Sequence, residues 1–80
     1  PSVTMVPDGQ GGNRLRIEYL RRIGAGLTYT PEFSSDMTWS AATQPVTVTP
    51  IDSTWERCIV DDSQSTTSTA KRFGRVRVQW

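Results

Sequence analysis

Apolar and polar residues alternate along much of this chain, and the alternation is clearest between residues 27 and 34. The apolar positions there are Leu27, Tyr29, Pro31 and Phe33, and the polar positions are Thr28, Thr30, Glu32 and Ser34. A period of two is typical of a β-strand that buries one face and exposes the other. The polar run 34–36 then favours a turn, and Trp39 follows with a large apolar side chain. The pattern predicts that a strand, a turn and an anchoring indole organise a small β core.

Other parts of the chain also have the composition of strands. These segments are residues 2–6, 14–20, 46–51, 55–60 and 71–80. Turn signals separate them at intervals of about 8–12 residues, and no segment has a helical period. The chain is therefore predicted to be all-β, either a small antiparallel β-sandwich of immunoglobulin or fibronectin size or a small open barrel.

The clearest local unit is the pair of segments 14–20 and 27–34. The Gly-containing link 23–26 lies between them, so we expect the two segments to form a hairpin. Pro31 has no backbone N–H, which predicts that its strand lies at an edge or carries a bulge. A second bulge is expected near the end of the chain, where Phe73 breaks the alternation and Gly74 follows it.

The other strand-like segments carry weaker signals. Pro45 and Pro50 bracket residues 46–51, with Val46 and Val48 expected to face inward, which suits an edge strand. The segment 55–60 has apolar residues at both parities, as a bulged strand or one covered on both faces would. The polar run 61–70 is the best candidate for a mobile loop. The residues expected in the core are Leu15, Ile17, Tyr29, Phe33, Trp39, Phe73, Val76 and Val78.

Composition limits both the size of the core and the classes of partner. Eighty residues predict one domain, residues 1–80, that buries only roughly 60% of its unfolded surface. The net charge of +1 does not support a nucleic-acid binder, and no run approaches the roughly 20 apolar residues of a membrane span. Cys58 is the single cysteine, so it has no disulfide partner within the chain and is expected to be a small buried apolar residue.

Few residues suggest chemistry, and we expect no catalytic residues and no cofactor. Histidine is absent, and the Gly-rich run 7–13 is not followed by the Lys-Ser/Thr of a phosphate-binding loop. Asp61 and Asp62 are a candidate calcium site because calcium takes several oxygen ligands. Trp55 follows a turn and is the candidate exposed ring for stacking on a sugar. Arg75 is a second candidate ligand-binding residue, expected to stack on an indole or to pair with Asp36.

Three stretches of the chain resemble a known kind of module. Arg21-Arg22, the run from Leu27 to Trp39 (LTYTPEFSSDMTW) and the run from Arg72 to Val78 (RFGRVRV) are similar to motifs of a short C-terminal β domain. That domain occurs at the ends of large secreted or surface proteins of planctomycete and verrucomicrobial bacteria. Pro31 stands where its pattern usually has valine, and Met37 where it has leucine.

The resemblance implies a cellular context rather than a chemistry. It implies an extracellular or cell-surface location and a position at the C-terminus of a longer exported bacterial protein, which the start at Pro1 without methionine also suggests. The expected partners are upstream domains of the same polypeptide, with an extracellular glycan or a surface protein as further candidates. The expected function is a non-catalytic structural or interaction module. The alternative is a carbohydrate-binding module that uses Trp55.

Overall fold

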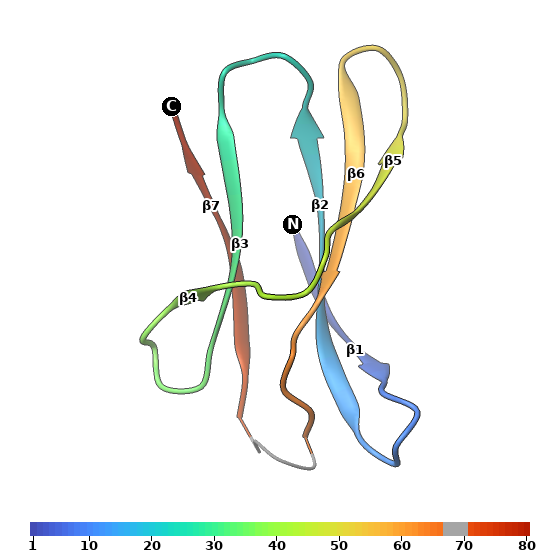
Figure 1. Ribbon diagram of the computed structural model, residues 1–80, viewed down its shortest axis with the longest axis vertical. Helices are drawn as coiled ribbons and strands as arrows, with labels where there is room; N and C mark the ends of the chain where they lie inside the picture. Colours follow the sequence, from blue (N-terminus) through green and yellow to red (C-terminus); the bar gives the residue numbers. More distant parts are fainter. Residues whose placement is uncertain (67–70) are drawn as a thin grey trace.

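Within the part of the chain that the structure describes, seven strands form two antiparallel sheets (Figure 1). The structure is a computed structural model that describes residues 1–66 and 71–80. The strands are β1 (Ser2–Pro7), β2 (Asn13–Arg22), β3 (Thr28–Ser34), β4 (Ser40–Ala41), β5 (Thr47–Pro50), β6 (Trp55–Asp61) and β7 (Phe73–Gln79). Among the described residues there is no helix, and hence none that is long and apolar enough to cross a membrane.

The two sheets form a β-sandwich, so the first of the two predicted architectures is confirmed and the open barrel is not. The first sheet has the order β1-β2-β6-β5, and the second has the order β4-β3-β7. Strands β2 and β7 lie against each other across the sandwich. Because one sheet has four strands and the other three, the inner face of the larger sheet is not fully covered. Val3 and Met5 on β1 share a face with buried residues of β2 and are nevertheless exposed.

The predicted hairpin of residues 14–34 is wrong, because β2 and β3 belong to different sheets. The link between them passes from one sheet to the other, with Gly24 and Gly26 at positive φ. Strand β6 occupies the place beside β2, and its register with β2 is unbroken from Arg16 opposite Asp61 to Arg22 opposite Trp55. The alternation correctly indicates the buried face of β2. In β3 it is wrong for the polar face, because Glu32 and Ser34, which were expected to be exposed, are buried. The apolar faces of the two strands pack together as layers instead of pairing edge to edge.

Both predictions for Pro31 are wrong, because β3 is the central strand of its sheet and its register with β7 is unbroken. The carbonyl oxygen of Pro31 accepts from the Ala42 N–H at 2.9 Å, on the side of β4. The backbone groups of one residue face the same neighbouring strand in an antiparallel sheet. The missing N–H of Pro31 therefore faces the two-residue strand β4, and the ladder with β7 does not need it.

The predicted bulge at Phe73 and Gly74 is also wrong, since these residues stand opposite Ser34 and Phe33 in the regular register. The glycine is explained by packing. A Cβ at position 74 would lie 3.1 Å from the Cγ1 and Cδ1 atoms of Ile17, which is fully buried. Close approach of β7 to β2 thus favours glycine at this position.

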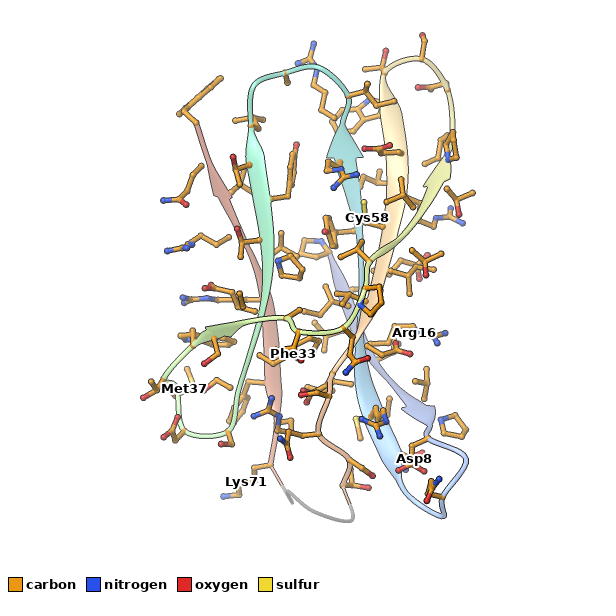
Figure 2. All side chains as sticks on the ribbon, in the orientation of Figure 1. Asp8, Arg16, Phe33, Met37, Cys58 and Lys71 are labelled. Atoms are coloured by element: carbon orange, nitrogen blue, oxygen red, sulfur yellow. The ribbon has the colours of Figure 1, made fainter. Side chains whose placement is uncertain are left out.

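The core is small and is centred on β2, β3 and β6, and Figure 2 labels Phe33 and Cys58 on two of these strands. The buried apolar residues are Leu15, Ile17, Tyr19, Phe33, Cys58 and Val60, and the residues packed around them are Tyr29, Ala42, Val46 and Val76. The prediction that Cys58 is buried is therefore confirmed. Trp39 is only half-buried, and Phe73 and Val78 are exposed, so these three core predictions are wrong.

Two of the remaining local predictions are confirmed only in part. Strand β5 is an edge strand as expected, with Val46 half-buried before it, but Val48 is exposed. No bulge interrupts β6, whose Cys58 and Val60 face the core while Ile59 is half-buried on the outer face.

The predicted mobile loop 61–70 begins with ordered residues. Asp61 ends β6, and Asp62 and Ser65 are buried. Residues 67–70 lie outside the described residues.

Candidate functional site

The four residues nominated from the sequence lie in three separate places. Trp55 begins β6 and Asp61 ends it, so the two lie at opposite ends of one strand. Asp62 follows directly and is buried, whereas Arg75 lies on the other sheet. The structure therefore does not bring these residues together into one site.

Asp62 and Arg72 form the most buried ion pair of the domain. Nε and Nη2 of Arg72 donate to the two carboxylate oxygens of Asp62 at 2.6 and 2.8 Å. The Asp62 side chain is only 1% exposed and that of Arg72 is 16% exposed. The hydrogen bond with Asp62 raises the pKa of Arg72. Both carboxylate oxygens are engaged by a fixed cation, so this pair holds the start of β7 against the end of β6.

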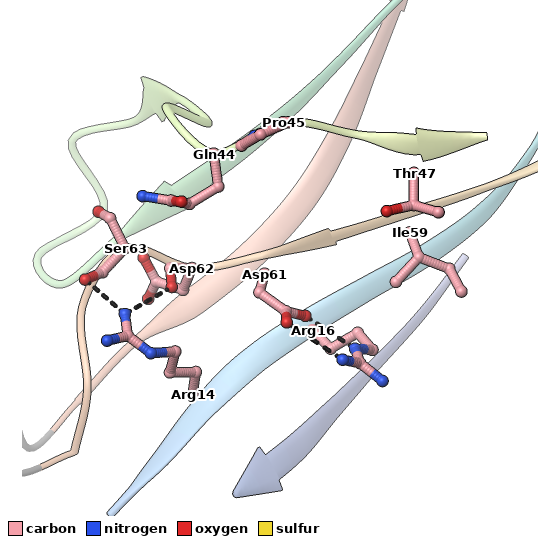
Figure 3. A pocket seen from close by; sticks show the side chains of 9 residues that line it. All are labelled: Arg14, Arg16, Gln44, Pro45, Thr47, Ile59, Asp61, Asp62 and Ser63. Carbon is pink, nitrogen blue, oxygen red and sulfur yellow. Dashed lines mark hydrogen bonds and ion pairs between the residues drawn. The ribbon is translucent and has the colours of Figure 1, made fainter. Parts of the chain in front are cut away.

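Asp61 is also held by an arginine, as the close view of this region shows (Figure 3). Nε and Nη2 of Arg16 donate to its two oxygens at 2.7 and 3.1 Å. Arg14 donates to the carbonyl oxygens of Asp62 and Ser63 at 3.0 and 2.6 Å. No three His, Cys, Asp or Glu side chains gather within the described part of the chain. The calcium hypothesis gains no support from this geometry, because both candidate carboxylates already have cationic partners.

Arg75 stacks on an indole, as one form of the hypothesis predicts, but it does not pair with Asp36. Its guanidinium carbon lies 4.2 Å from the centroid of the Trp39 ring, and its Nε donates to Oε1 of the buried Glu32 at 2.9 Å. Asp36 instead accepts from the Thr38 N–H at 2.9 Å, which lowers its pKa. Arg75 thus stacks on the half-buried Trp39 and pairs with Glu32, while its side chain stays 45% exposed.

Trp55 is the nominated aromatic residue, and its side chain is open to solvent. It is 39% exposed and stands opposite Arg22 in the register of β6 with β2. The carboxylate of Asp52 accepts from the N–H groups of Thr54 and Trp55, both at 2.8 Å, and so orders the turn that presents the ring. The outer face of the four-stranded sheet continues with Arg57, which pairs with Glu18 at 3.2 Å. The exposed indole of Trp55 at one end of this outer face is therefore the candidate aromatic platform of the sheet.

The open side between β1 and β7 was not foreseen from the sequence. An apolar hollow of about 370 Å³ lies at one end of this side, lined in part by Met5, Leu15 and Phe73. A second hollow, of about 260 Å³, is lined in part by Tyr19, Tyr29, Val76 and Val78. The sequence offers one signal for such an opening: its strand-like segments contain more apolar residues than a core this thin can bury.

The thiol of Cys58 lies beside the Tyr19 ring in the core and not in any of these places. The two residues are cross-strand partners. Burial raises the pKa of the Cys58 thiol, and burial together with the neighbouring Cys58 raises the pKa of Tyr19 from its usual 10.0 to about 12. A thiol with a raised pKa is a poor nucleophile at neutral pH, so this residue has a packing role.

We expect the free energy of unfolding to fall as the pH rises from about 9 towards 12. Both groups have a higher pKa in the folded state, so their stabilisation is complete below the unfolded-state values and is lost as the pH passes through the folded-state values. Urea unfolding at a series of pH values measures the decline. The Tyr19→Phe variant should decline less steeply than the parent. Identical profiles for Tyr19→Phe and the parent would contradict this account.

The chain matches no protein-family model, no curated protein and no solved structure.

Proposed function

We propose that this domain is a non-catalytic interaction module of an exported bacterial protein. The observation that carries the proposal is that all eight acidic side chains have structural partners. Five are paired with arginines: Glu18 with Arg57, Glu32 with Arg75, Glu56 with Arg21, Asp61 with Arg16 and Asp62 with Arg72. The other three, Asp8, Asp36 and Asp52, accept hydrogen bonds from backbone N–H groups of their own loops.

This use of the acidic residues argues against acid–base chemistry. A general acid or base needs a carboxyl or imidazole group poised near a substrate, and histidine is absent. The only thiol is buried. The ionisable groups that could carry a reaction instead stabilise the fold.

The exported setting is supported by the resemblance of residues 14–78 to the C-terminal β domains of secreted and surface proteins. The experiment is a fractionation of cells that produce the full polypeptide, with protease added to intact cells. We expect the domain in the culture medium or in the protease-accessible fraction. Recovery in the protected cytoplasmic fraction only would contradict the exported setting.

A carbohydrate-binding module is the second candidate, and the exposure of Trp55 favours it. Aromatic rings present an apolar face that can stack on the apolar face of a sugar, and the polar edge of the ring remains hydrated. On the same outer face, Arg57 can donate hydrogen bonds to sugar hydroxyl groups and Glu18 can accept hydrogen bonds from them. The alternative therefore needs only residues that are already exposed.

One experiment with two readouts tests both candidates. The domain is incubated with a panel of esters, phosphate monoesters, glycosides and peptides to measure turnover, and is applied to a glycan array with and without calcium. We expect no turnover. Glycan binding that is lost in Trp55→Ala and retained in the control Trp80→Ala, whose ring is 94% exposed, would select the carbohydrate alternative. Reproducible turnover by the purified domain would overturn the non-catalytic proposal.

A further inference from the structure

Strand β7 forms a complete outer edge of the smaller sheet. It is seven residues long, pairs with β3 on one side, and has no pairing strand on the other side among residues 1–66 and 71–80. Phe73–Gln79 contains no proline, so every residue of the strand keeps its N–H. A long unpaired strand of this kind is a template for the addition of another strand.

The register identifies which backbone groups face this edge. Pro31 directs its carbonyl towards Ala42 and therefore away from β7. Its partner Val76 must then direct its own N–H and carbonyl groups away from β3, and the same holds for residues two positions away, Gly74 and Val78. The free edge thus presents the main-chain donors and acceptors of three alternate residues.

The other sheet edges are shorter or interrupted. Strand β4 has two residues, and β5 has four and ends at Pro50. Strand β1 ends at Pro7; because the N–H of Asp8 donates to Gly12 at the side of β2, Pro7 faces the free edge of β1. Proline and short length are the usual means of blocking strand addition. Of the edges that the structure describes, β7 is the one that lacks both.

The outer face of β7 carries an excess of positive charge. Glu32 lies between two arginines: Oε1 accepts from Arg75 at 2.9 Å, and Oε2 lies 3.9 Å from Nε of Arg77. One negative carboxylate therefore lies beside two positive guanidinium groups, which leaves a net positive charge. The Arg77 side chain is 51% exposed. A second copy of β7 added antiparallel about Val76 would place Arg75 opposite Arg77, and like charges in such a pair are destabilising.

The inner face of β7 is apolar and incompletely covered. Val76 and Val78 line a hollow together with Tyr29 of the neighbouring strand β3 and Tyr19 of the other sheet. Val78 is half exposed. A strand placed beside β7 would direct alternate side chains into this opening and the remaining ones towards the arginines.

We propose that the free edge of β7 binds an extended segment of another protein in which acidic residues alternate with apolar residues. The main chain of that segment pairs with Gly74, Val76 and Val78, its apolar side chains enter the opening between the sheets, and its carboxylates lie beside Arg75 and Arg77. This is recognition by strand addition, in which main-chain bonds provide affinity and alternate side chains provide specificity. The proposal rests on the proposed function as an interaction module and names its partner class.

The test uses three blocked synthetic peptides with alternating residues. The first alternates Val and Glu, the second alternates Val and Lys, and the third is the Glu peptide with N-methyl groups on the amides of one edge. NMR titration measures affinity, and hydrogen exchange measures protection of the Val76 and Val78 amides. We expect the Glu peptide to bind at least about tenfold more tightly than the Lys peptide and to protect both amides. N-methylation should abolish binding.

Two protein variants locate the site. Arg77→Glu should weaken binding of the Glu peptide by about fivefold, and the control Arg57→Glu should leave it within about twofold. Arg57 is a matched control because its side chain is 52% exposed and it lies on the other sheet. If Arg77→Glu does not fold, Arg77→Gln replaces it, and the comparison of Glu and Lys peptides does not depend on either variant.

The outcomes separate this inference from the proposed function. No binding of the Glu peptide, equal binding of the Lys peptide, or protection confined to amides outside β7 would each overturn the inference. None of these results concerns turnover, so the non-catalytic proposal would stand. Turnover in the substrate panel would remove the proposed function and, with it, the basis of this inference.

Discussion

Replacing Arg72 by Met is expected to lower the free energy of unfolding by about 3–5 kcal/mol. The variant keeps most of the apolar stem but removes the guanidinium that satisfies the Asp62 carboxylate, which is 1% exposed. A carboxylate buried without its cation is costly, because it has lost its hydration and Asp62 then keeps only the hydrogen bond from the Gln64 N–H at 3.2 Å. Small domains have total stabilities of roughly 5–15 kcal/mol, so this change removes a large fraction of the total. Urea unfolding followed by tryptophan fluorescence measures the loss.

Two further variants show whether the unpaired Asp62 carboxylate causes the loss of stability. Lys71→Met makes the matched change at the preceding, exposed residue and should alter stability by at most about 0.5 kcal/mol. The double variant Asp62→Asn with Arg72→Met contains no buried charge and should recover part of the loss. A double variant as unstable as the sum of its single changes would mean that packing of the Arg72 stem, and not the ion pair, supplies the stability.

Replacing Ile17 by Ala is expected to cost about 2–5 kcal/mol. Ile17 is fully buried and lies where β2 and β7 meet across the sandwich. The change removes apolar surface and leaves a cavity in a core that has few other members. Ile51→Ala is the control, because Ile51 is half exposed and should lose about 1 kcal/mol or less. Urea unfolding of the two variants gives the comparison.

A double-mutant cycle with Gly74→Ala tests the contact itself. In the parent, the added methyl group would lie 3.1 Å from Cγ1 and Cδ1 of Ile17, so Gly74→Ala should destabilise by about 1–3 kcal/mol. In the Ile17→Ala background those two atoms are gone, and the same change should cost much less. Additive effects of the two substitutions would contradict the close approach that this structure assigns to β2 and β7.

The alternation of apolar and polar residues predicts burial correctly for residues whose burial depends on their own segment. Leu15, Ile17 and Phe33 were expected in the core and lie there. The failures arose where another segment covers or exposes the residue. The sequence predicts Phe73 in the apolar core, but close packing of Gly74 on Ile17 fixes the face of β7 and leaves Phe73 exposed. No pattern within residues 71–80 carries that information.

The candidate site residues also differ in whether local sequence or tertiary structure determines their environment. The exposure of Trp55 was expected from the turn before it, and that turn is local. Arg72, directly before β7, pairs with Asp62, directly after β6. Arg75 on β7 pairs with Glu32 on β3 and not with Asp36. Arginine and carboxylate have many possible partners in a chain with nine basic and eight acidic side chains. Only the positions of the strands select among them.

The sequence by itself determined that this protein is all-β, where most of its strands lie and which face of β2 is buried. These properties follow from a period of two and from turn residues, which act within a few positions of the chain. The tertiary structure alone decided that β2 pairs with β6, that the apolar faces of β2 and β3 stack as layers, and that β7 has a free edge beside an apolar opening. A strand's own pattern marks its apolar face but not its neighbour, because pairing depends on the summed burial and hydrogen bonding of segments far apart in the chain.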